Sequence, residues 1–411
     1  MLIVAVLLLT AACSQPASAH HPTSSPTPAS TPVPTPTPSP PACATAQMTT
    51  PVPGVSSSLP VLQLASGLNQ PDDLLVTSDS IYVGEYGNGK IDQLAGLAGS
   101  PPSPLPVTVP EVEGVAFIGS TMYASDQAND RVVSVSGSQV QSFLQLRPVP
   151  GILSVDSIFS AGSTLVVPDS PRSDVLLVGA NGQVQKTLTG FLRPVGGWPL
   201  ANGDLAIPDE NRGQVIEVNP TTGAQSVLAG GLGEADDVVQ DTTGKIYAIS
   251  IDQGRMVSIA GGTAQNVVSG LGQPQGLGID AANNPMLTEN TEGRLDVVVT
   301  TFKLSAPAAA APALTPGQPL CIQLTRAPGY SSPVTIDPGT GYQILQQPGA
   351  GSQGSVLPQG CTGMCQVEVR VESGGLHDTV RLTYQAAPPT PTPSPSPTPR
   401  HAPTPKRSPS R

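Results

Sequence analysis

The middle of this sequence lacks the side chains on which many enzymes depend. No histidine lies between residues 22 and 376, and no cysteine lies between residues 44 and 320. That long segment therefore has neither the most common general base nor a thiol nucleophile. It also contains no Gly-x-Ser-x-Gly elbow and no phosphate-binding loop. These absences exclude the classes of enzyme that need such groups.

Positive charge is also scarce, because 18 Lys and Arg residues accompany 29 Asp and Glu residues, for a net charge of −11. The imbalance is concentrated in residues 55–303, where 25 acidic and 11 basic side chains give a net charge of −14. A protein that binds nucleic acid needs Lys and Arg to neutralise phosphates. We therefore predict no nucleic-acid partner.

The first residues are predicted to be an export signal. Residues 1–12 (MLIVAVLLLTAA) form an apolar run that is too short to span a bilayer and is typical of a signal peptide. "LTAAC" is similar to the lipobox of bacterial lipoproteins and would make Cys13 the lipidated first residue. "ASA" before His20 is instead typical of ordinary secretion. We expect an extracytoplasmic monomer that touches the membrane only through a lipid anchor, with plain secretion as the alternative.

Proline occurs 48 times and is concentrated toward the two ends. Residues 13–53 and 387–411 are rich in Pro, Thr and Ser, a composition that cannot bury a core and prefers extended polyproline II. We predict a disordered tether at 13–53 and a disordered tail at 387–411. The Ala- and Pro-rich residues 304–317 are predicted to be a linker.

The five cysteines fit an exported protein. If Cys13 carries lipid, Cys43, Cys321, Cys361 and Cys365 remain, and four cysteines allow three disulfide connectivities. A zinc site is the weaker interpretation, because the Cys-x3-Cys pair has no second close pair and no nearby histidine.

The central segment repeats itself with a period near forty residues. One column of residues, mostly acidic, recurs at intervals of 39–43 residues: Glu85, Asp126, Asp169, Asp209, Ser250 and Glu289. We call it the turn column. A second column, the inner column, lies thirteen or fourteen residues upstream: Asp72, Glu113, Asp156, Gly196, Asp236 and Gln275. Two columns that keep one period across six units indicate six structural repeats.

Each repeat unit contains four short hydrophobic runs separated by Gly, Asn, Asp and Ser, as strands and turns require. Four strands at this period predict a six-bladed β-propeller over residues 54–303. The sixth unit lacks a fourth strand, and residues 61–71 match the fourth strands of other units, so we expect an N-terminal strand to close the ring. Alternating apolar residues at 318–386 predict a small β-sandwich, and the whole fold is all-β.

The repeat units resemble those of a known propeller family. "VEGVAF…MYASDQANDRVV" (112–133), "QPQGLGID…LTENTEGRL" (273–295) and "QPDDLLV…YVGEYGNGKI" (70–91) are similar to NHL repeats and to the gluconolactonase (senescence marker protein) family. In that family the inner column holds ligands of a divalent metal. "EGV" (113–115), "DDL" (72–74) and "DDV" (236–238) match this pattern in part, whereas the family's Asn ligands are replaced by Gly196 and Gln275.

The inner column is the candidate site. We expect this column to lie at one end of the central channel, where several carboxylates repel one another unless they take up protons or a cation. Oxygen ligands favour Ca²⁺ or another divalent cation, and no organic cofactor is expected. The alternative is that the acids diverge and only make a negative patch. The candidate metal ligands are Asp72, Glu113, Asp156, Asp236 and Gln275.

The turn column is interpreted differently. An acid present in five of six units is more natural as a brace for the turn that follows it than as part of one active site. These predicted structural acids are Glu85, Asp126, Asp169, Asp209 and Glu289. The only tryptophan, Trp198, occupies an inner strand, where it is either a core residue or a platform on which a sugar stacks.

Two functions remain open. The first is a binding protein that presents a channel face to a protein, peptide or glycan. The second is a divalent-metal-dependent lactonase or ester hydrolase of the gluconolactonase type. The missing histidines argue against propeller enzymes that use a histidine base, such as streptogramin B lyases.

Overall fold

The computed structural model describes residues 44–45, 51–98, 101–152, 155–304, 313–315 and 317–386, and all of them lie in one compact unit. These residues form β-strands and three short 3-10 helices. Within these ranges, no helix has the length and apolar character needed to cross a membrane. The predicted signal peptide, Cys13, most of the tether and the 387–411 tail lie outside the described residues.

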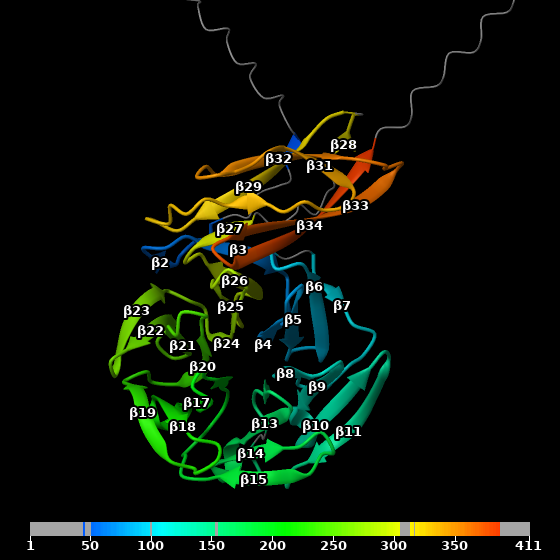
Figure 1. Cartoon of the computed structure of the whole chain (residues 1–411). Coiled ribbons are helices and arrows are strands. Elements are labelled where there is room, and N and C mark those ends of the chain that lie inside the picture. Colours follow the sequence, from blue (N-terminus) through cyan, green and yellow to red (C-terminus); the bar gives the residue numbers. More distant parts are fainter. Residues whose placement is uncertain are drawn as a thin grey trace, which may run out of the picture. The chain divides into compact units, whose positions relative to one another are not determined.

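Six antiparallel sheets surround one axis and form the blades of a propeller (Figure 1). Blade 1 contains β4 (Pro71–Val76), β5 (Ser80–Glu85), β6 (Lys90–Ala95) and β7 (Ser103–Pro104). Blade 2 contains β8 (Val115–Ile118), β9 (Thr121–Asp126), β10 (Arg131–Ser136) and β11 (Gln139–Gln145). Blade 3 contains β12 (Phe159–Ala161), β13 (Thr164–Asp169), β14 (Asp174–Val178) and β15 (Val184–Leu188).

The second half of the ring follows the same order from the inner strand outward. Blade 4 contains β16 (Trp198–Pro199), β17 (Leu205–Asp209), β18 (Gln214–Val218) and β19 (Gln225–Gly230). Blade 5 contains β20 (Ala235–Gln240), β21 (Ile246–Ser250), β22 (Arg255–Ala260) and β23 (Thr263–Ser269), with the short β2 (Ser56–Ser57) added outside β23. Blade 6 contains β24 (Pro274–Ile279), β25 (Pro285–Glu289), β26 (Arg294–Val298) and β3 (Val61–Ser66).

Blade 6 therefore combines strands from both ends of the propeller segment. Its outer strand β3 pairs antiparallel with β26, from Arg294↔Ser66 to Val298↔Val61. The pairing covers an edge that would otherwise expose a row of backbone donors and acceptors. It also ties blade 6 to the start of blade 1, since β3 leads directly into β4.

The same backbone turn recurs between the second and third strand of every blade. The residue before the third strand has a positive φ of 50–72° in all six blades: Gly89, Asp130, Ser173, Gly213, Gly254 and Gly293. Four of the six are glycine, which adopts this left-handed conformation without a steric cost. In blades 2, 3 and 4 the preceding turn is a 3-10 helix: η1 (Gln127–Asn129), η2 (Ser170–Arg172) and η3 (Glu210–Arg212).

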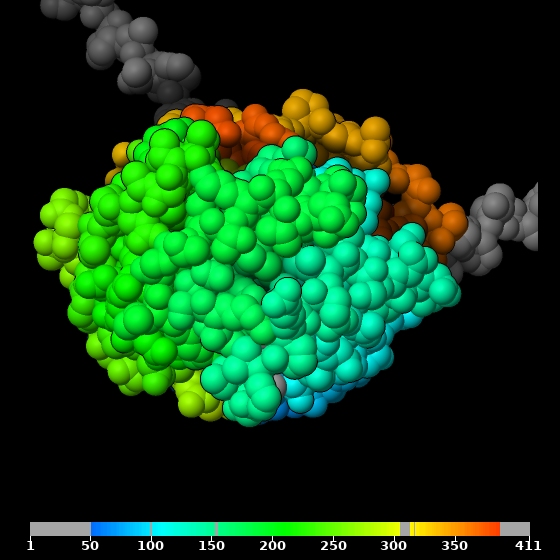
Figure 2. Space-filling model, turned by 90° about the horizontal axis from the view of Figure 1, so that it is seen from below, coloured from blue at the N-terminus to red at the C-terminus, as the bar shows by residue number. Residues whose placement is uncertain are grey.

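The hydrophobic core is divided among the blade interfaces. Each of six buried clusters takes its side chains from two adjacent blades; one, for example, joins Val133 of blade 2 to Ile91 of blade 1. Neighbouring strand residues such as Leu205 and Ala206 point into different clusters, as the two-residue period of a strand requires. On the face seen in Figure 2, the atoms of successive segments lie against one another, with colours from cyan to green. Since no blade contains a complete hydrophobic core of its own, each blade is stabilised by its neighbours in the ring.

The remaining strands form two further sheets that enclose a single core. One sheet has the order β1 (Ala44–Thr45), β29 (Leu320–Arg326), β32 (Gln353–Pro358), β31 (Tyr342–Gln346), with β27 (Phe302–Leu304) also paired to β29. The other has the order β28 (Ala313–Leu314), β34 (Leu376–Ala386), β33 (Met364–Ser373), β30 (Thr335–Ile336). Ile322 of the first sheet and Val369 of the second lie in the same buried cluster.

Two predicted boundaries need correction. The tether was predicted to reach residue 53, but Val52 is buried against blades 5 and 6, Pro51 bridges to Leu62, and β1 pairs with β29. The linker was predicted to begin at residue 304, but Leu304 is buried in β27, and Ala313–Leu314 pairs with β34. Val52, Leu304 and Leu314 belong to the folded body because their apolar side chains are buried, despite the prolines nearby in the sequence.

One disulfide of the described residues joins Cys361 to Cys365. Cys321 is also disulfide-bonded. The Cys-x3-Cys pair is therefore a covalent loop and does not form the zinc site that was the weaker interpretation.

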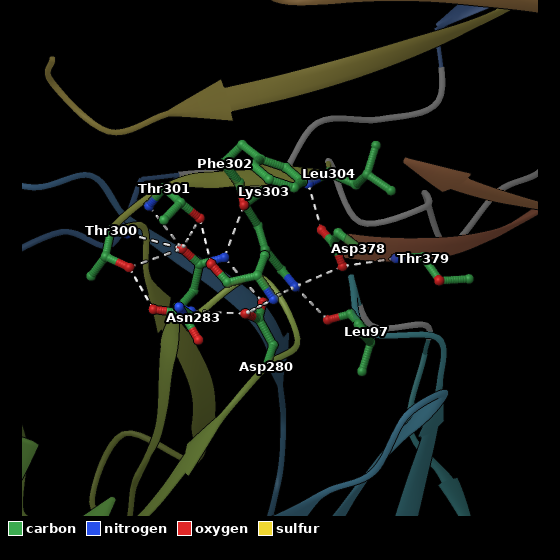
Figure 3. Close-up of polar contacts among 12 residues, drawn as sticks. Leu97, Asp280, Asn283, Thr300, Thr301, Phe302, Lys303, Leu304, Asp378 and Thr379 are labelled. Atoms are coloured by element: carbon green, nitrogen blue, oxygen red, sulfur yellow. Dashed lines mark hydrogen bonds and ion pairs between the residues drawn. The ribbon is translucent and has the colours of Figure 1, made fainter. Parts of the chain in front are cut away.

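A buried lysine joins the second pair of sheets to the propeller (Figure 3). Lys303 of β27 is 0% exposed and uses all three of its ammonium protons. They are donated to the Leu97 carbonyl oxygen at 2.6 Å, Asp280 Oδ2 at 2.8 Å and Asp378 Oδ1 at 3.1 Å. Burial lowers the pKa of Lys303, but the two aspartates more than offset this, so its pKa lies above the ordinary value. Lys303 is therefore charged in the folded protein.

The replacement Lys303→Met tests this junction, because it leaves two buried carboxylates without their cation. We expect the free energy of unfolding to fall by about 3–5 kcal/mol, as when one partner of a buried ion pair is removed. Chemical denaturation of the full chain measures the change. The exposed Lys90→Met is the control, with an expected change within about 0.5 kcal/mol. Equal effects of the two replacements would contradict the role given to Lys303.

Candidate functional site

The inner column lies where the inner strand of each blade begins. In blades 1, 5 and 6 a β-bulge occurs at this point, between Pro71 and Leu74, Ala235 and Val238, and Pro274 and Leu277. A bulge places two residues opposite one on the neighbouring strand and redirects their side chains. The repeated bulge therefore explains why two successive residues of these blades can both point toward the channel axis.

All five predicted metal ligands lie on one cavity. It has a volume of about 270 Å³ and is lined by Asp72, Glu113, Asp156, Asp236 and Gln275, which come from five different blades. The prediction that the inner column converges at one channel mouth thus agrees with the geometry. The cavity also contains side chains that the repeat analysis missed: Arg193, Glu210 and Glu234. We call this cavity the acidic mouth.

The carboxyl groups of the acidic mouth shift one another's ionisation. Burial raises the pKa of Asp72 well above its ordinary range, and the charges of Asp73 and Asp156 raise it further. Burial likewise raises the pKa of Glu113, with the charge of Asp72 as the next cause. The same two causes raise the pKa of Asp236 well above its ordinary value. At neutral pH these groups cannot all be ionised without a cation among them.

Arg193 supplies one positive charge from the fourth blade, whose inner-column residue is Gly196. Its guanidinium contacts Asp156 Oδ2 at 3.2 Å and also pairs with Glu210. Asp156 further accepts hydrogen bonds from Gln127 Nε2 at 2.8 Å and Ser170 Oγ at 2.7 Å. Burial still raises the pKa of Asp156, because these partners offset it only in part.

The carboxylates as arranged do not fit a divalent metal ion. Among the described residues, no three Asp, Glu, His or Cys side chains are placed to hold one. Asp156 is already committed to Arg193, Ser170 and Gln127, and it also shares a hydrogen bond with Glu113. The predicted ligands thus meet in one place, but not in an arrangement of described side chains that holds a metal ion.

A second ring is formed by the residue that follows each inner-column residue, and the sequence repeat did not predict it. Its members alternate around the axis between polar residues and glycine: Asp73, Gly114, Ser157, Gly197, Asp237 and Gly276. The glycines lie where neighbouring inner strands touch. A Cβ at Gly276 would lie 2.5 Å from Asp73 Cα, and one at Gly114 would lie 2.8 Å from Ser157 Cα. The close approach of the blades leaves space for only three side chains in this ring.

Those three side chains bond to one another. Ser157 donates its hydroxyl proton to Asp73 Oδ2, and Asp73 and Asp237 share a side-chain hydrogen bond. Asp73 and Asp237 are only 6% and 5% exposed. Burial raises the pKa of Asp73 to about 7, and burial together with the charge of Asp73 raises that of Asp237 well above its usual range. The pair therefore carries a shared proton near neutral pH.

Backbone donors hold the pair in place. Asp73 Oδ1 accepts the Leu74 N–H at 2.6 Å, Asp237 Oδ1 accepts the Val238 N–H at 2.8 Å, and Asp237 Oδ2 accepts the Leu277 N–H of the next blade at 2.8 Å. Such bonds favour the ionised form, but they do not outweigh burial.

A second cavity lies further along the inner strands. It measures about 210 Å³, shares Asp73 and Ser157 with the acidic mouth, and is otherwise lined mainly by apolar residues. The predicted binding residue Trp198 lies here, beside Phe159, and away from the predicted metal ligands. Trp198 also packs against the cores of blades 4, 5 and 6, as expected of a core residue, and its role as a platform for a sugar stays a prediction.

The turn column is buried at the ends of the second strands, away from both cavities. Asp126 Oδ2 accepts from Arg131 Nε at 2.7 Å, Asp169 pairs with Arg172 at 3.2 Å, and Glu289 pairs with Arg294 at 2.5 Å. Asp209 accepts the backbone N–H groups of Leu192 and Arg193 and pairs with Arg212. Glu85 accepts from Asn88 of its own turn. These contacts support the interpretation of the column as a brace.

Asp209→Asn tests the brace. The amide offers one acceptor where the carboxylate oxygens receive two backbone N–H groups and an arginine, so a buried donor loses its partner. We expect the free energy of unfolding to fall by about 1–3 kcal/mol in a chemical denaturation experiment. The exposed Asp79→Asn is the control, with little expected effect if the turn contacts are what matters. A loss of 0.3 kcal/mol or less for Asp209→Asn, on the order of surface replacements, would contradict the brace.

The channel carboxyls also predict how stability depends on pH. Their pKa values are raised in the folded state, that of Asp73 to about 7, so above the ordinary Asp and Glu values the folded chain binds more protons than the unfolded chain. Stability is thus highest at acidic pH and is lost as the pH rises through the folded pKa values. Calorimetry should show the melting temperature falling from pH 6 to pH 8.

The variant Asp73→Asn should make that fall less steep, because one titrating group with a pKa of about 7 is removed. The exposed Asp79→Asn should keep the slope of the unmodified chain. A melting temperature that rises from pH 6 to pH 8 would show that the channel carboxyls are ionised without a cost.

Neither a protein-family model nor a curated protein sequence matches this sequence. Among solved structures, the chain is similar to a gluconolactonase from Xanthomonas campestris, with 11% identity, a TM-score of 0.50, and coverage of 62% of this chain and 98% of that chain. The PQQ-bound form of an aldose sugar dehydrogenase from Streptomyces coelicolor gives 15% identity, a TM-score of 0.48 and coverage of 61% and 99%. A virginiamycin B lyase from Staphylococcus aureus gives 9% identity, a TM-score of 0.44, and coverage of 65% of this chain and 95% of that chain. At these identities the likeness concerns the fold alone, and the predicted all-β propeller of the gluconolactonase type is confirmed at that level.

Proposed function

We propose that this protein is an extracytoplasmic, lipid-anchored binding protein that holds the cationic group of a protein or peptide in its acidic mouth. The observation that carries the proposal is the convergence of carboxyl groups from four blades, with Gln275 from a fifth, on one cavity of about 270 Å³. The export signal, the lipobox-like "LTAAC" and the Pro-rich residues after it support the location.

The charge of the acidic mouth is only partly balanced by the protein itself. Arg193 pairs with Asp156 and Glu210. Burial and the charges of other carboxyl groups raise the pKa values of Asp72, Glu113 and Asp236. No Lys or Arg is among the causes of these shifts. An ammonium or guanidinium ion bound there would relieve this repulsion and would let the carboxyls ionise.

The lining of the mouth favours a cationic group over a glycan. Its carboxyl groups accept hydrogen bonds, and ammonium and guanidinium ions carry only donors. A glycan has weaker donors and would lack an aromatic platform, because Trp198 does not line this cavity.

A divalent-metal-dependent lactonase of the gluconolactonase type is the second candidate. Its oxygen-only donor set is what favours it. The carboxylates do not form a metal-binding arrangement in the described residues, because Asp156 is held by Arg193, Ser170 and Gln127. No catalytic step is therefore derived through a metal.

Peptide binding to the full chain tests the proposal. A short lysine-containing peptide should bind with an affinity that falls as salt is added, and the same peptide with acetylated lysine should not bind, because the charge is removed. The pair Glu113→Gln and Asp236→Asn should weaken binding about tenfold or more, since each lost charged hydrogen bond is worth about 1.5–3 kcal/mol. Isothermal titration calorimetry measures both effects.

Two controls make the test decisive. Asp79→Asn removes an exposed acid outside the cavity and should leave binding unchanged. Equal binding of the acetylated peptide would overturn the proposal. A rise in melting temperature with millimolar Ca²⁺ or Mn²⁺ that is lost in Glu113→Gln, together with hydrolysis of a lactone, would instead favour the second candidate.

A further inference from the structure

We infer that the channel contains a second ligand site, the apolar cavity beside Trp198, and that it takes a small organic ammonium ion with an apolar or aromatic body. The site is separate from the acidic mouth and rests on different residues. Its walls bind the body of the ligand, and the Asp73–Asp237 pair at its base binds the ammonium group.

The walls are built from the inner strands of five blades. The apolar residues include Leu75, Val76, Val115, Ile158, Pro199 and Leu277. The rings of Phe159 and Trp198 complete them, and Trp198 is half-buried, so part of the indole is open to the cavity. A cavity of about 210 Å³ with this lining suits a single aromatic or short aliphatic group.

The base of the cavity is charged and has no basic side chain beside it. Asp73 and Asp237 line it, together with the hydroxyl residues Ser157 and Ser160, and no lysine, arginine or histidine is among the lining residues. The partners of the two carboxyls are the Ser157 hydroxyl, backbone N–H groups and each other. No cationic side chain of the lining balances the pair, which shares a proton instead, and an ammonium ion bound at close range would take over that role.

The chemistry of the ligand follows from these two parts. An ammonium ion supplies three donors to carboxylate oxygens, and one of them would replace the proton that Asp73 and Asp237 share. Trp198 adds a cation–π contribution that an alcohol cannot gain. The pair would repel an anion. A neutral aromatic molecule would make the apolar contacts with the walls but would form no ion pair with Asp73 and Asp237.

The two channel sites are close but distinguishable. Asp73 and Ser157 line both cavities, whereas Glu113 lines only the acidic mouth and Asp237 lines only the apolar cavity. A variant at Glu113 therefore probes the proposed peptide site, and a variant at Asp237 probes this one. Failure of either proposal leaves the other unaffected.

Intrinsic fluorescence gives a direct readout, because Trp198 is the only tryptophan in the chain. The probe is 2-phenylethylamine, with 2-phenylethanol as the neutral analogue of the same shape and phenylacetate as the anion. We expect the amine to change the Trp198 emission with a saturable dependence on concentration. The alcohol should bind at least about tenfold more weakly, and phenylacetate should cause no saturable change.

The variants separate charge from shape. Asp237→Asn should weaken amine binding at least about tenfold and leave binding of the alcohol unchanged, because the amide keeps the size but loses the charge. Glu113→Gln should leave amine binding unchanged. Phe159→Leu makes a wall side chain smaller without altering the acids, so it should weaken binding of the amine and of the alcohol to the same extent. Near-ultraviolet circular dichroism establishes that each variant is folded.

Three results would overturn the inference: no saturable emission change with the amine, equal affinity for amine and alcohol, or equal loss of amine binding in Glu113→Gln and Asp237→Asn. If Asp237→Asn fails to fold, Asp73→Asn carries the same expectation for the amine.

Discussion

The close packing of six inner strands around one axis is the constraint on which the rest of this structure depends. The blades approach so closely that the second ring is glycine in every other blade, and backbone hydrogen bonds pass directly between blades, as from Asp73 N to the Glu113 carbonyl oxygen at 3.1 Å. The remaining side chains are forced together, and most of them are acids. Burial of these acids and the repulsion between them are thus consequences of the packing, and the raised pKa values follow mainly from the burial and then from the repulsion.

The same constraint separates the channel into two environments. The ring of Asp73, Ser157 and Asp237 lies between a polar cavity lined by carboxyls and an apolar cavity lined by aromatic rings. Lys303 shows how the protein treats a buried charge that it balances itself, with two aspartates and a carbonyl group around one ammonium ion (Figure 3). The channel carboxyls have no such internal partner except Arg193. The contrast between these two sites is the reason to expect ligands in the channel.

Much of the fold was readable from the sequence, because a period near forty residues with two acidic columns leaves few alternatives to a propeller. The turn column was identifiable as a brace, since Asp126 is followed by Arg131 in the same unit and the pattern recurs. The inner column was identifiable as a converging set, since one position of every blade must lie at the same end of the axis.

Other parts depend on contacts that no local pattern encodes. Asp73 and Asp237 looked like second copies of their neighbours, and only the structure shows that both line the apolar cavity, Asp73 together with the acidic mouth. Arg193 precedes its blade's inner strand in an irregular segment, and it reaches Asp156 of the adjacent blade. Lys303 lay at a predicted boundary, where its three partners come from distant parts of the chain. The metal prediction assumed that converging acids require a bound metal ion. In the structure, Arg193 and shared protons supply part of the positive charge that these acids require.

The central claim is that the acidic mouth holds protons that a bound cation displaces. Calorimetric titration of a lysine-containing peptide at pH 7, in two buffers with different enthalpies of ionisation, measures this exchange directly. A cation lowers the pKa values of the surrounding carboxyls, so the account predicts a net release of protons on binding, which is reduced in Glu113→Gln. Binding without proton release would show that the carboxyls were already ionised and would contradict the account.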